Sequence, residues 1–198
     1  MKMSILLSTL TATALITSHA YAAEPLKEKG GYIGLAYGAS QFEDDGAFDG
    51  DVDDDGRAWQ IYGGYRFFKY LAVEGRYTNF GEFKSDLGFD EVKEKYSTFT
   101  AHALGIYPFG QSGVDIYGQL GVGFVLYEFS GQIFGIDVDV NDTAGTFSYG
   151  AGLRYTPPGF QRLTVQLAYD AYLFQAEGPY RNYDQSLSMA KLGVQFNF

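Results

Sequence analysis

The sequence contains no cysteine, and only 5 of its 198 residues are prolines. The absence of cysteine excludes disulfides, thiolate–metal sites and a lipid anchor attached to a cysteine. The scarcity of proline leaves long stretches in which strands can run without interruption. Basic residues are also scarce, with 14 Lys and Arg against 24 Asp and Glu. This acidic balance argues against a nucleic acid partner, whose phosphates the protein surface would repel.

Long hydrophobic runs are absent after residue 22. Before that point, Lys2 precedes an apolar stretch at residues 5–16, and Ala20-Tyr21-Ala22 supplies small residues at the −3 and −1 positions. This pattern predicts a cleavable signal peptide over residues 1–22 and one domain over residues 23–198. Cleavage after Ala20 is an alternative, and a short buried helix is another. The stretch is too short to span a bilayer as a helix.

Alternation with a period of two replaces helical periodicity in the rest of the chain. Near the start, Ile33, Leu35 and Tyr37 alternate with smaller residues. Segments of this kind cover residues 33–40, 59–66, 71–78, 98–107, 116–126, 147–155, 163–170 and 189–198. They predict eight strands, each with one apolar face and one small or polar face.

The connections between these segments alternate strictly in length. Short connections lie at residues 68–70, 108–113 and 156–160, and long ones at residues 43–56, 81–95, 128–143 and 174–184. This asymmetry favours a membrane barrel over a soluble sandwich or a soluble ligand-binding barrel. We therefore expect an all-β fold, an eight-stranded antiparallel up-and-down transmembrane β-barrel with short periplasmic turns, long external loops and both termini periplasmic.

Aromatic residues make up 18% of the sequence, and many fall where membrane interfaces should lie. One predicted belt consists of Phe67, Tyr70, Tyr107, Tyr155, Phe196 and Phe198. The other consists of Phe42, Trp59, Phe80, Tyr96, Phe129 and Phe147.

Two segments resemble a known family. The run AWQIYGGYRF at residues 58–67, followed by residues 70–75, is similar to strands 2 and 3 of the OmpA-like outer-membrane β-barrel domain family. The last six residues, which include Phe196 and Phe198, resemble the C-terminal assembly signal of such barrels. The resemblance implies a bacterial outer-membrane location, with membrane lipid and the barrel assembly machinery as partners. Because the sequence ends at Phe198, we expect no peptidoglycan-binding domain.

Charged residues occur on the predicted inward faces: Arg66, Glu74, Arg76, Asp115, Arg154, Asp170 and Lys191. A buried charge is tolerated only when it is paired or hydrated. A short turn after residue 67 places Glu74 opposite Gly64, which leaves Glu74 room to reach neighbouring arginines. We expect a static lumenal ion-pair network with Glu74, Arg76 and Arg154 near its centre. The alternative is a narrow gated channel that uses these residues as its gate.

The first long connection is acidic throughout and contains Asp51, Asp53 and Asp55, followed by Gly56. This spacing matches the start of an EF-hand loop, but Tyr62 occupies the position where the loop needs Glu. An EF-hand is thereby excluded. A weak external calcium site and a solvated acidic loop both remain consistent with the sequence.

His102 is the only histidine after the predicted cleavage site. A lone histidine makes a poor metal site, and lipid-modifying barrel enzymes need a histidine with a partner in one cleft. We expect His102 to form hydrogen bonds in the lumen, and we expect no enzymatic activity and no cofactor.

The third long connection carries alternating apolar residues at 131–140. We expect it to extend the barrel wall as a hairpin, with an exposed partner-binding surface as the alternative. The sequence as a whole favours a structural or surface-interaction role through the external loops. A small diffusion channel is the alternative, and a lipid-modifying enzyme has less support.

Overall fold

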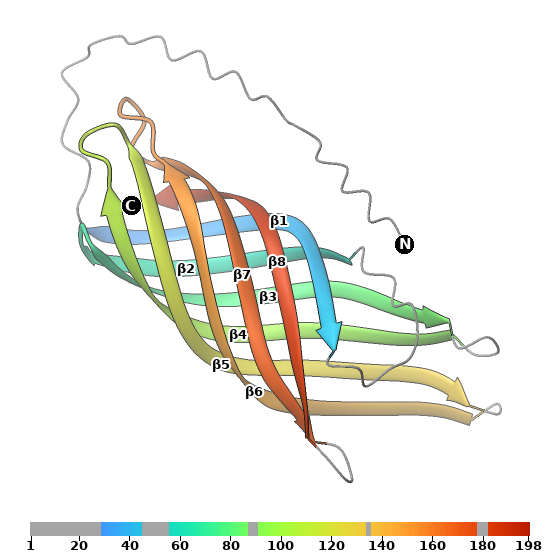
Figure 1. Cartoon of the computed structure of the whole chain (residues 1–198). Helices are drawn as coiled ribbons and strands as arrows, with labels where there is room; N and C mark the ends of the chain where they lie inside the picture. The colour runs from blue at the N-terminus through green and yellow to red at the C-terminus, as the bar shows by residue number, and fades with distance from the viewer. Residues whose placement is uncertain (1–28, 45–55, 87–90, 134–135, 178–181) are drawn as a thin grey trace, which may run out of the picture.

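The computed structural model describes residues 29–44, 56–86, 91–133, 136–177 and 182–198, with the side chains of some strand ends left out. Eight strands account for nearly all of this part of the chain (Figure 1). They are β1 (Gly30–Asp44), β2 (Gly56–Phe68), β3 (Leu71–Asp86), β4 (Glu91–Pro108), β5 (Val114–Ile133), β6 (Ile136–Tyr155), β7 (Leu163–Glu177) and β8 (Asn182–Asn197). The described residues include no helix that is long and apolar enough to cross a membrane.

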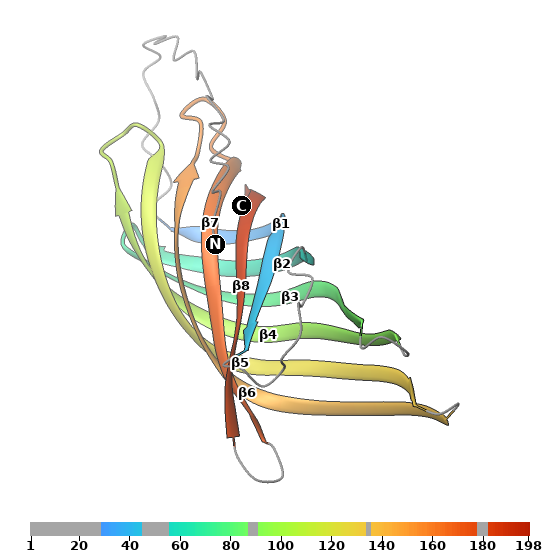
Figure 2. The ribbon, with the colours of Figure 1, turned by 45° about the vertical axis from the view of Figure 1, so that its right-hand side comes forward.

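Every strand pairs antiparallel with its sequence neighbours, and β1 pairs with β8 to close the barrel. The closing seam runs from Tyr32 opposite Asn197 to Asp44 opposite Gln185. Closure satisfies the backbone hydrogen bonds of the wall without leaving a strand edge, as a lipid environment requires. Figures 1 and 2 show the strands winding obliquely around a common axis. The predicted eight-stranded antiparallel barrel is confirmed.

The two ends of the barrel differ. The turns β2–β3, β4–β5 and β6–β7 lie at one end, which we call the short-turn end, together with the C-terminus (Figure 1). The β4–β5 turn is held by a hydrogen bond from Phe109 N to Val114 O of 2.9 Å. Gly113 has a φ of 79°, and a Cβ there would lie 2.1 Å from the carbonyl oxygen of Thr156. Glycine is therefore required where two turns meet.

At the opposite end, which we call the hairpin end, paired strands occupy much of the chain where the sequence predicted long loops. The connections predicted at residues 81–95, 128–143 and 174–184 are mostly strand. In the first, β3 continues to Asp86 and β4 begins at Glu91. In the second, β5 continues to Ile133 and β6 begins at Ile136, and in the third, β7 continues to Glu177 and β8 begins at Asn182. Backbone pairing continues where the apolar alternation weakens, since hairpin hydrogen bonds do not depend on a lipid-facing surface. The predicted wall extension at residues 131–140 is confirmed by pairs such as Gly131–Val138.

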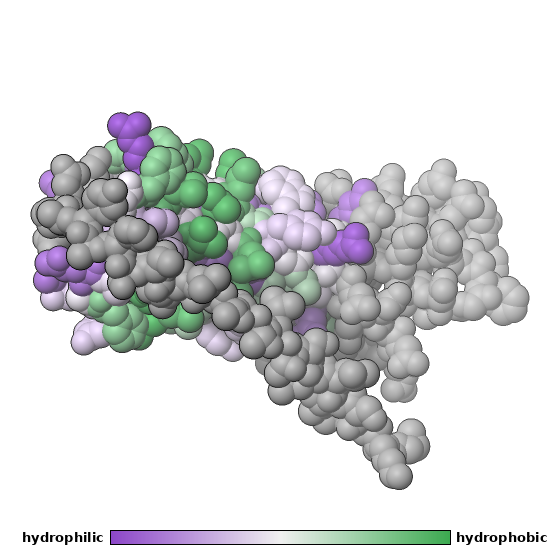
Figure 3. Space-filling model, turned by 90° about the horizontal axis from the view of Figure 1, so that it is seen from above, coloured by the Kyte–Doolittle hydropathy of each residue, from purple (hydrophilic) through white to green (hydrophobic). Residues whose placement is uncertain are grey.

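The apolar faces point outward. Leu120, Val122 and Leu192 are 59%, 63% and 63% exposed, whereas their neighbours Gln119 and Lys191 are buried. On the face in Figure 3, hydrophobic residues form a band with hydrophilic residues on both sides. This arrangement matches a protein whose central outer surface contacts lipid and whose two ends contact water.

The predicted aromatic belts are right at the short-turn end and partly wrong at the other. Phe67, Tyr70, Tyr107, Tyr155, Phe196 and Phe198 are all exposed on the outer wall, as are Trp59 and Phe147. In contrast, Phe42, Phe80 and Tyr96 are buried inside the barrel. Each lies an even number of residues from an inward neighbour such as Ser40, Thr78 or Thr98, so strand alternation turns it inward. The side chain of Phe129 lies outside the described residues.

Outward aromatic residues toward the hairpin end include several that were not predicted. Tyr77 packs between Trp59 and Phe99, with ring centroids 5.4 and 4.7 Å away. Phe99 lies opposite Phe124 on the next strand. Tyr37, Tyr77, Phe99 and Phe124, together with the correctly predicted Trp59 and Phe147, therefore supply the aromatic surface at this end.

Candidate functional site in the barrel lumen

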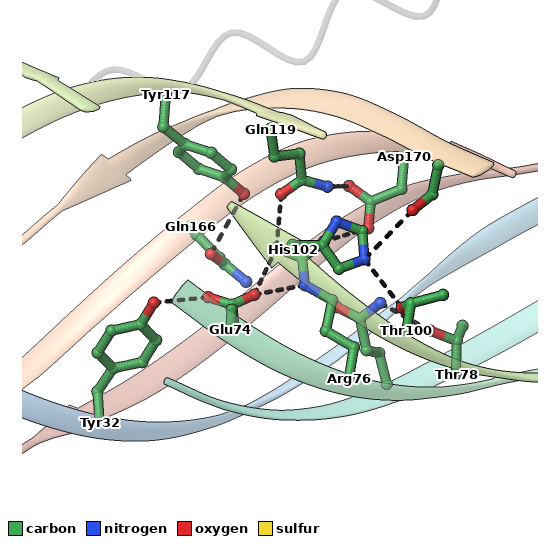
Figure 4. A network of polar contacts seen from close by, with 12 residues as sticks. Tyr32, Glu74, Arg76, Thr78, Thr100, His102, Tyr117, Gln119, Gln166 and Asp170 are labelled. Carbon is green, nitrogen blue, oxygen red and sulfur yellow. Dashed lines mark hydrogen bonds and ion pairs between the residues drawn. The ribbon is translucent and has the colours of Figure 1, made fainter. Parts of the chain in front are cut away.

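Glu74, on β3, is the first of two carboxylates that organise the lumen (Figure 4). It forms an ion pair with Arg76 on the same strand. Its other oxygen, Oε2, accepts a 3.1 Å bond from Nη2 of Arg154 on β6 and a 2.9 Å hydrogen bond from the Tyr32 hydroxyl on β1. The Glu74 side chain is fully buried. One carboxylate thus connects three strands across the interior.

Asp170, on β7, is the second such carboxylate. It forms an ion pair with Lys191 on β8, and its Oδ2 lies 3.0 Å from Nη1 of Arg76. Its Oδ1 accepts a 2.8 Å hydrogen bond from Nε2 of Gln119 on β5. Arg76 therefore bridges the two carboxylates, and Glu74, Arg76, Arg154, Asp170 and Lys191 form one connected network.

Neutral side chains complete the network. Gln119 Oε1 accepts a 2.5 Å hydrogen bond from Arg76, and Gln60 Oε1 accepts a 2.5 Å hydrogen bond from Lys191. Gln60 also donates a 2.7 Å hydrogen bond to Thr78. The roles of Tyr32, Gln60 and Gln119 were not predicted from the sequence. All three lie on inward faces, so strand alternation was the available signal, but alternation says nothing about partners across the barrel.

Arg66 does not belong to this network, contrary to expectation. Its Nη2 lies 3.0 Å from Oδ2 of Asp115 and donates a 3.0 Å hydrogen bond to the Lys69 carbonyl. The Arg66 side chain keeps 21% of its surface exposed. The predicted charged set is therefore divided into a buried central network and a separate pair near the short-turn end.

The strand register at Glu74 is as predicted, but its consequence differs. Glu74 lies opposite Gly64, and Arg76 lies opposite Tyr62. The space at Gly64 is taken by the Tyr32 ring, since a Cβ at Gly64 would lie 2.6 Å from the Tyr32 hydroxyl oxygen. Gly64 thus admits the tyrosine that binds Glu74, and not an arginine.

The network contains three cations, Arg76, Arg154 and Lys191, and two carboxylates. The guanidinium of Arg154 lies 4.3 Å from the centroid of the Tyr117 ring and 5.6 Å from that of the Tyr32 ring. Aromatic faces attract a cation most strongly where water is excluded. The two rings therefore help to offset the excess positive charge in the lumen.

Apolar side chains cover the network on both sides. Toward the hairpin end lies a buried cluster of Phe42, Ala58, Phe80, Tyr96, Val125, Tyr172, Phe174, Leu187 and Met189. Toward the short-turn end lies a second cluster of Tyr32, Ala36, Tyr62, Ala72, Leu104, Ile106, Tyr117 and Ala168. The ion pairs are thus enclosed by packed side chains, as an eight-stranded interior allows.

His102 lies inside the barrel beside the network (Figure 4). Its Nε2 is 2.8 Å from the Thr100 hydroxyl oxygen and 3.5 Å from that of Ser148, while its buried Nδ1 has no partner. No carboxylate orients the ring toward Ser148, as a catalytic triad would require. Within the described residues, no group of three His, Asp or Glu side chains could hold a metal ion.

The other predicted site residues lie apart from the lumen. Phe196 and Phe198 are exposed on the outer side, 46% and 66% respectively. Asp51, Asp53 and Asp55 lie outside the described residues, as does the predicted signal peptide at residues 1–22.

This closed eight-stranded architecture agrees with a family match. The profile of the outer membrane protein beta-barrel domain family matches residues 8–198. The chain belongs to this family. It is therefore an integral β-barrel protein of the bacterial outer membrane, as the OmpA-like resemblance implied.

Solved structures of similar fold include Ail, the attachment invasion locus protein of Yersinia pestis. Ail is 22% identical, with a TM-score of 0.56 and coverage of 86% of this chain and 99% of Ail. Neisserial surface protein A is 18% identical, with a TM-score of 0.59 and coverage of 85% and 97%. AlkL is 18% identical, with a TM-score of 0.52 and coverage of 91% and 96%. These likenesses show the fold. No curated protein sequence matches the chain.

Proposed function

We propose that the protein is a closed, non-conducting barrel that serves a structural or surface-interaction role. The observation that carries this proposal is the layer of fully buried ion pairs at the centre of the lumenal network. The side chains of Glu74, Arg76, Asp170 and Lys191 have no exposed surface. An aqueous path through this layer would need the ion pairs to separate and the apolar clusters on both sides to move.

The energetic argument supports closure. Separating a buried ion pair without a replacement partner costs several kcal/mol, on the order of 3–5. Glu74 and Asp170 share Arg76, so opening one pair disturbs the other. A resting population of open barrels would therefore be small.

Conductance of the refolded protein in a planar lipid bilayer tests this proposal. We expect a silent bilayer, together with a compact band in unboiled SDS samples that shifts on boiling. Reproducible channels from a heat-modifiable sample would contradict closure. A sample without the heat shift would show that the barrel had not folded, and its silence would carry no weight.

A narrow gated channel is the second candidate, and one observation favours it. Glu74 contacts both Arg76 and Arg154, and Asp170 contacts both Arg76 and Lys191. Each carboxylate could therefore give up its ion pair with one cation while it keeps the ion pair with the other. If the network is a gate, Glu74→Ala and Arg154→Ala will change conductance, whereas the matched control Arg66→Gln, outside the network, will not.

We also propose that the short-turn end is periplasmic and that the hairpins extend outside the cell. The asymmetry between tight turns and long hairpins supports this orientation. An epitope inserted between residues 134 and 135 should be detected on intact cells. The same epitope between residues 111 and 112 should need permeabilised cells. The reverse labelling pattern would contradict the orientation.

We propose that a partner binds to the external connections at the hairpin end. Ail has been solved in complex with sucrose octasulfate, a heparin analogue. The first connection of this chain is strongly acidic, so we propose a basic partner or a divalent cation instead of a polyanion. Asp51, Asp53 and Asp55 form the proposed weak calcium site. Calorimetric titration with calcium should show heat that Asp53→Asn reduces; identical heats would remove this site.

Two further proposals concern the ends of the chain and rest on its sequence. We propose cleavage after Ala22 and recognition of Phe196 and Phe198 by the barrel assembly machinery. An enzymatic role has little support, because the only histidine among the described residues is enclosed in the lumen without an orienting carboxylate.

A further inference from the structure

The outer wall carries a groove across β4, β5 and β6. Gly105 lies opposite Gly118, and Gly118 lies opposite Ala151, so small outward residues adjoin on three strands. A Cβ added at Gly105 or Gly118 would meet nothing within 4 Å. The groove has a volume of about 860 Å³ and is shallow and open on its lipid-facing side.

Larger outward side chains border this row. The row nearer the short-turn end contains Tyr107, Ile116, Leu153 and Leu167, which lie opposite one another in turn. Leu120 and Tyr149 form the other border. On β7 the small-residue row is interrupted by Tyr169, an outward tyrosine that lines the groove, and on β8 the row ends at Ala190. The groove is therefore apolar, and it faces the lipid.

The groove crosses the membrane obliquely. Gly105 is close to the end of β4 at Pro108, about 10 Å along the strand, whereas Ala190 is about 23 Å from the end of β8 at Asn197. One end of the groove therefore lies near the membrane interface, and the other lies near the middle of the bilayer. A lipid acyl chain follows the same course from its headgroup to its terminal methyl.

A cation lies at the interfacial end. Tyr70 lines the groove, and its carbonyl accepts a 2.9 Å hydrogen bond from the amide of Ile106. The ammonium of Lys69 lies 4.9 Å from the centroid of the Tyr70 ring. An ammonium beside an aromatic side chain at the interface favours an anionic headgroup.

We propose that this groove binds one acyl chain of an anionic glycerophospholipid, with the headgroup phosphate at Lys69. The apolar floor holds the chain, and Lys69 selects the charge. The site does not depend on whether the lumen conducts.

A second groove on the outer wall supplies an internal comparison. It measures about 560 Å³, and its lining includes Gly63, Gly75 and Ala101. Its outward residues are apolar or aromatic, and its floor lies farther from the short-turn end: Ala101 is about 23 Å along β4 from Pro108. Arg76 is the one cation in its lining, and the Arg76 side chain is fully buried in the lumenal ion pairs, so this groove should hold lipid without selecting charge.

The test is native mass spectrometry of the refolded full-length protein released from nanodiscs of phosphatidylcholine with a minor fraction of phosphatidylglycerol. We expect phosphatidylglycerol to be enriched about five-fold among the retained lipids, which is the effect expected of one lysine at a membrane surface. Lys69→Gln should abolish the enrichment but leave lipid bound. Gly118→Leu and, separately, Ala151→Leu should reduce retention of both lipids by filling the groove.

Gly75→Leu is the matched control, because it fills the second groove, where an added Cβ meets only the Gly63 carbonyl at 4.0 Å. It should leave the enrichment unchanged. Each variant is first checked for the heat shift of a folded barrel. Retention of the two lipids in their bulk ratio by the wild type would overturn the proposal. So would equal loss in Gly118→Leu and Gly75→Leu, or a protein dimer that only Gly118→Leu removes.

Discussion

At the residue scale, the interior depends on Asp170, which joins side chains from β3, β5 and β8. Its carboxylate contacts Lys191, Arg76 and Gln119, and its side chain is fully buried. Each of these groups loses its water on folding, so each depends on the others for compensation. A single substitution should therefore have effects well beyond one hydrogen bond.

Asp170→Asn should destabilise the barrel by about 3–5 kcal/mol, because it removes the carboxylate that pairs with Lys191 and leaves Arg76 with Glu74 alone. The measurement is urea unfolding from lipid vesicles, followed by Trp59 fluorescence. Combining Asp170→Asn with Lys191→Met should recover much of the loss, since it removes the unpaired cation as well. Additive losses in the double variant would show that the two residues are not coupled.

Leu120→Arg tests the outer wall. Leu120 is 59% exposed toward the lipid, and an arginine at the bilayer midplane costs about 2–4 kcal/mol. The same unfolding experiment measures the loss. Phe109→Arg, in the β4–β5 turn, is the control and should cost about 0–1 kcal/mol. Equal losses at both positions would contradict the assigned position of Leu120 in the membrane.

The sequence predicted which side chains of each strand point into the barrel better than it predicted the contacts between those side chains. Alternation placed Glu74, Asp170 and Lys191 inward, because the side-chain period of a strand is two. It could not show that Arg66 would bind Asp115, since that contact joins strands far apart in sequence. Phe42, Phe80 and Tyr96 were assigned outward because aromatic residues are common at interfaces, although alternation placed them inward.

At the scale of single elements, the hairpins extend farther than the sequence suggested. β5 and β6 are 20 residues each, twice the length of about ten that spans a membrane. Alternation of apolar residues marks only the part of a strand that faces lipid. Beyond it, backbone pairing continues without a pattern that a single sequence reveals.

Shortening the β5–β6 hairpin separates these two parts. Replacing residues 131–138 with a short turn removes paired ends such as Gly131–Val138 but leaves the wall around Leu120 and Tyr149. We expect the heat shift and refolding yield to persist, because the lipid-facing part is intact. Cell-surface binding to a basic partner should decline if the hairpin forms part of that surface. Loss of the heat shift would show instead that the hairpin is needed for the barrel itself.

At the scale of the whole molecule, the seam between β1 and β8 makes a sheet into a barrel. Phe198 donates its backbone N–H to the Gly31 carbonyl at 3.0 Å, and its ring would lie 2.6 Å from a Cβ at Gly31. The last residue of the chain therefore packs against the first strand.

Deleting Phe198 should reduce the yield of assembled barrel in cells several-fold, as the resemblance of residues 193–198 to an assembly signal implies. Refolding of the purified variant into vesicles should change much less, because most of the seam remains. Phe109→Ala, at another exposed aromatic residue of the short-turn end, is the control. Equal yields in cells for the wild type and the Phe198 deletion would rule out the signal.

The seam also sets the order of events during biogenesis. Tyr32 pairs with Asn197, so the ring of hydrogen bonds cannot close until nearly the whole chain has been synthesised. Contacts between residues so distant in sequence form slowly, because a long loop must close before they contribute. Until then, both β1 and β8 expose unpaired edges that invite aggregation. We therefore expect the chain to reach the outer membrane unfolded and to close the barrel there in a late step.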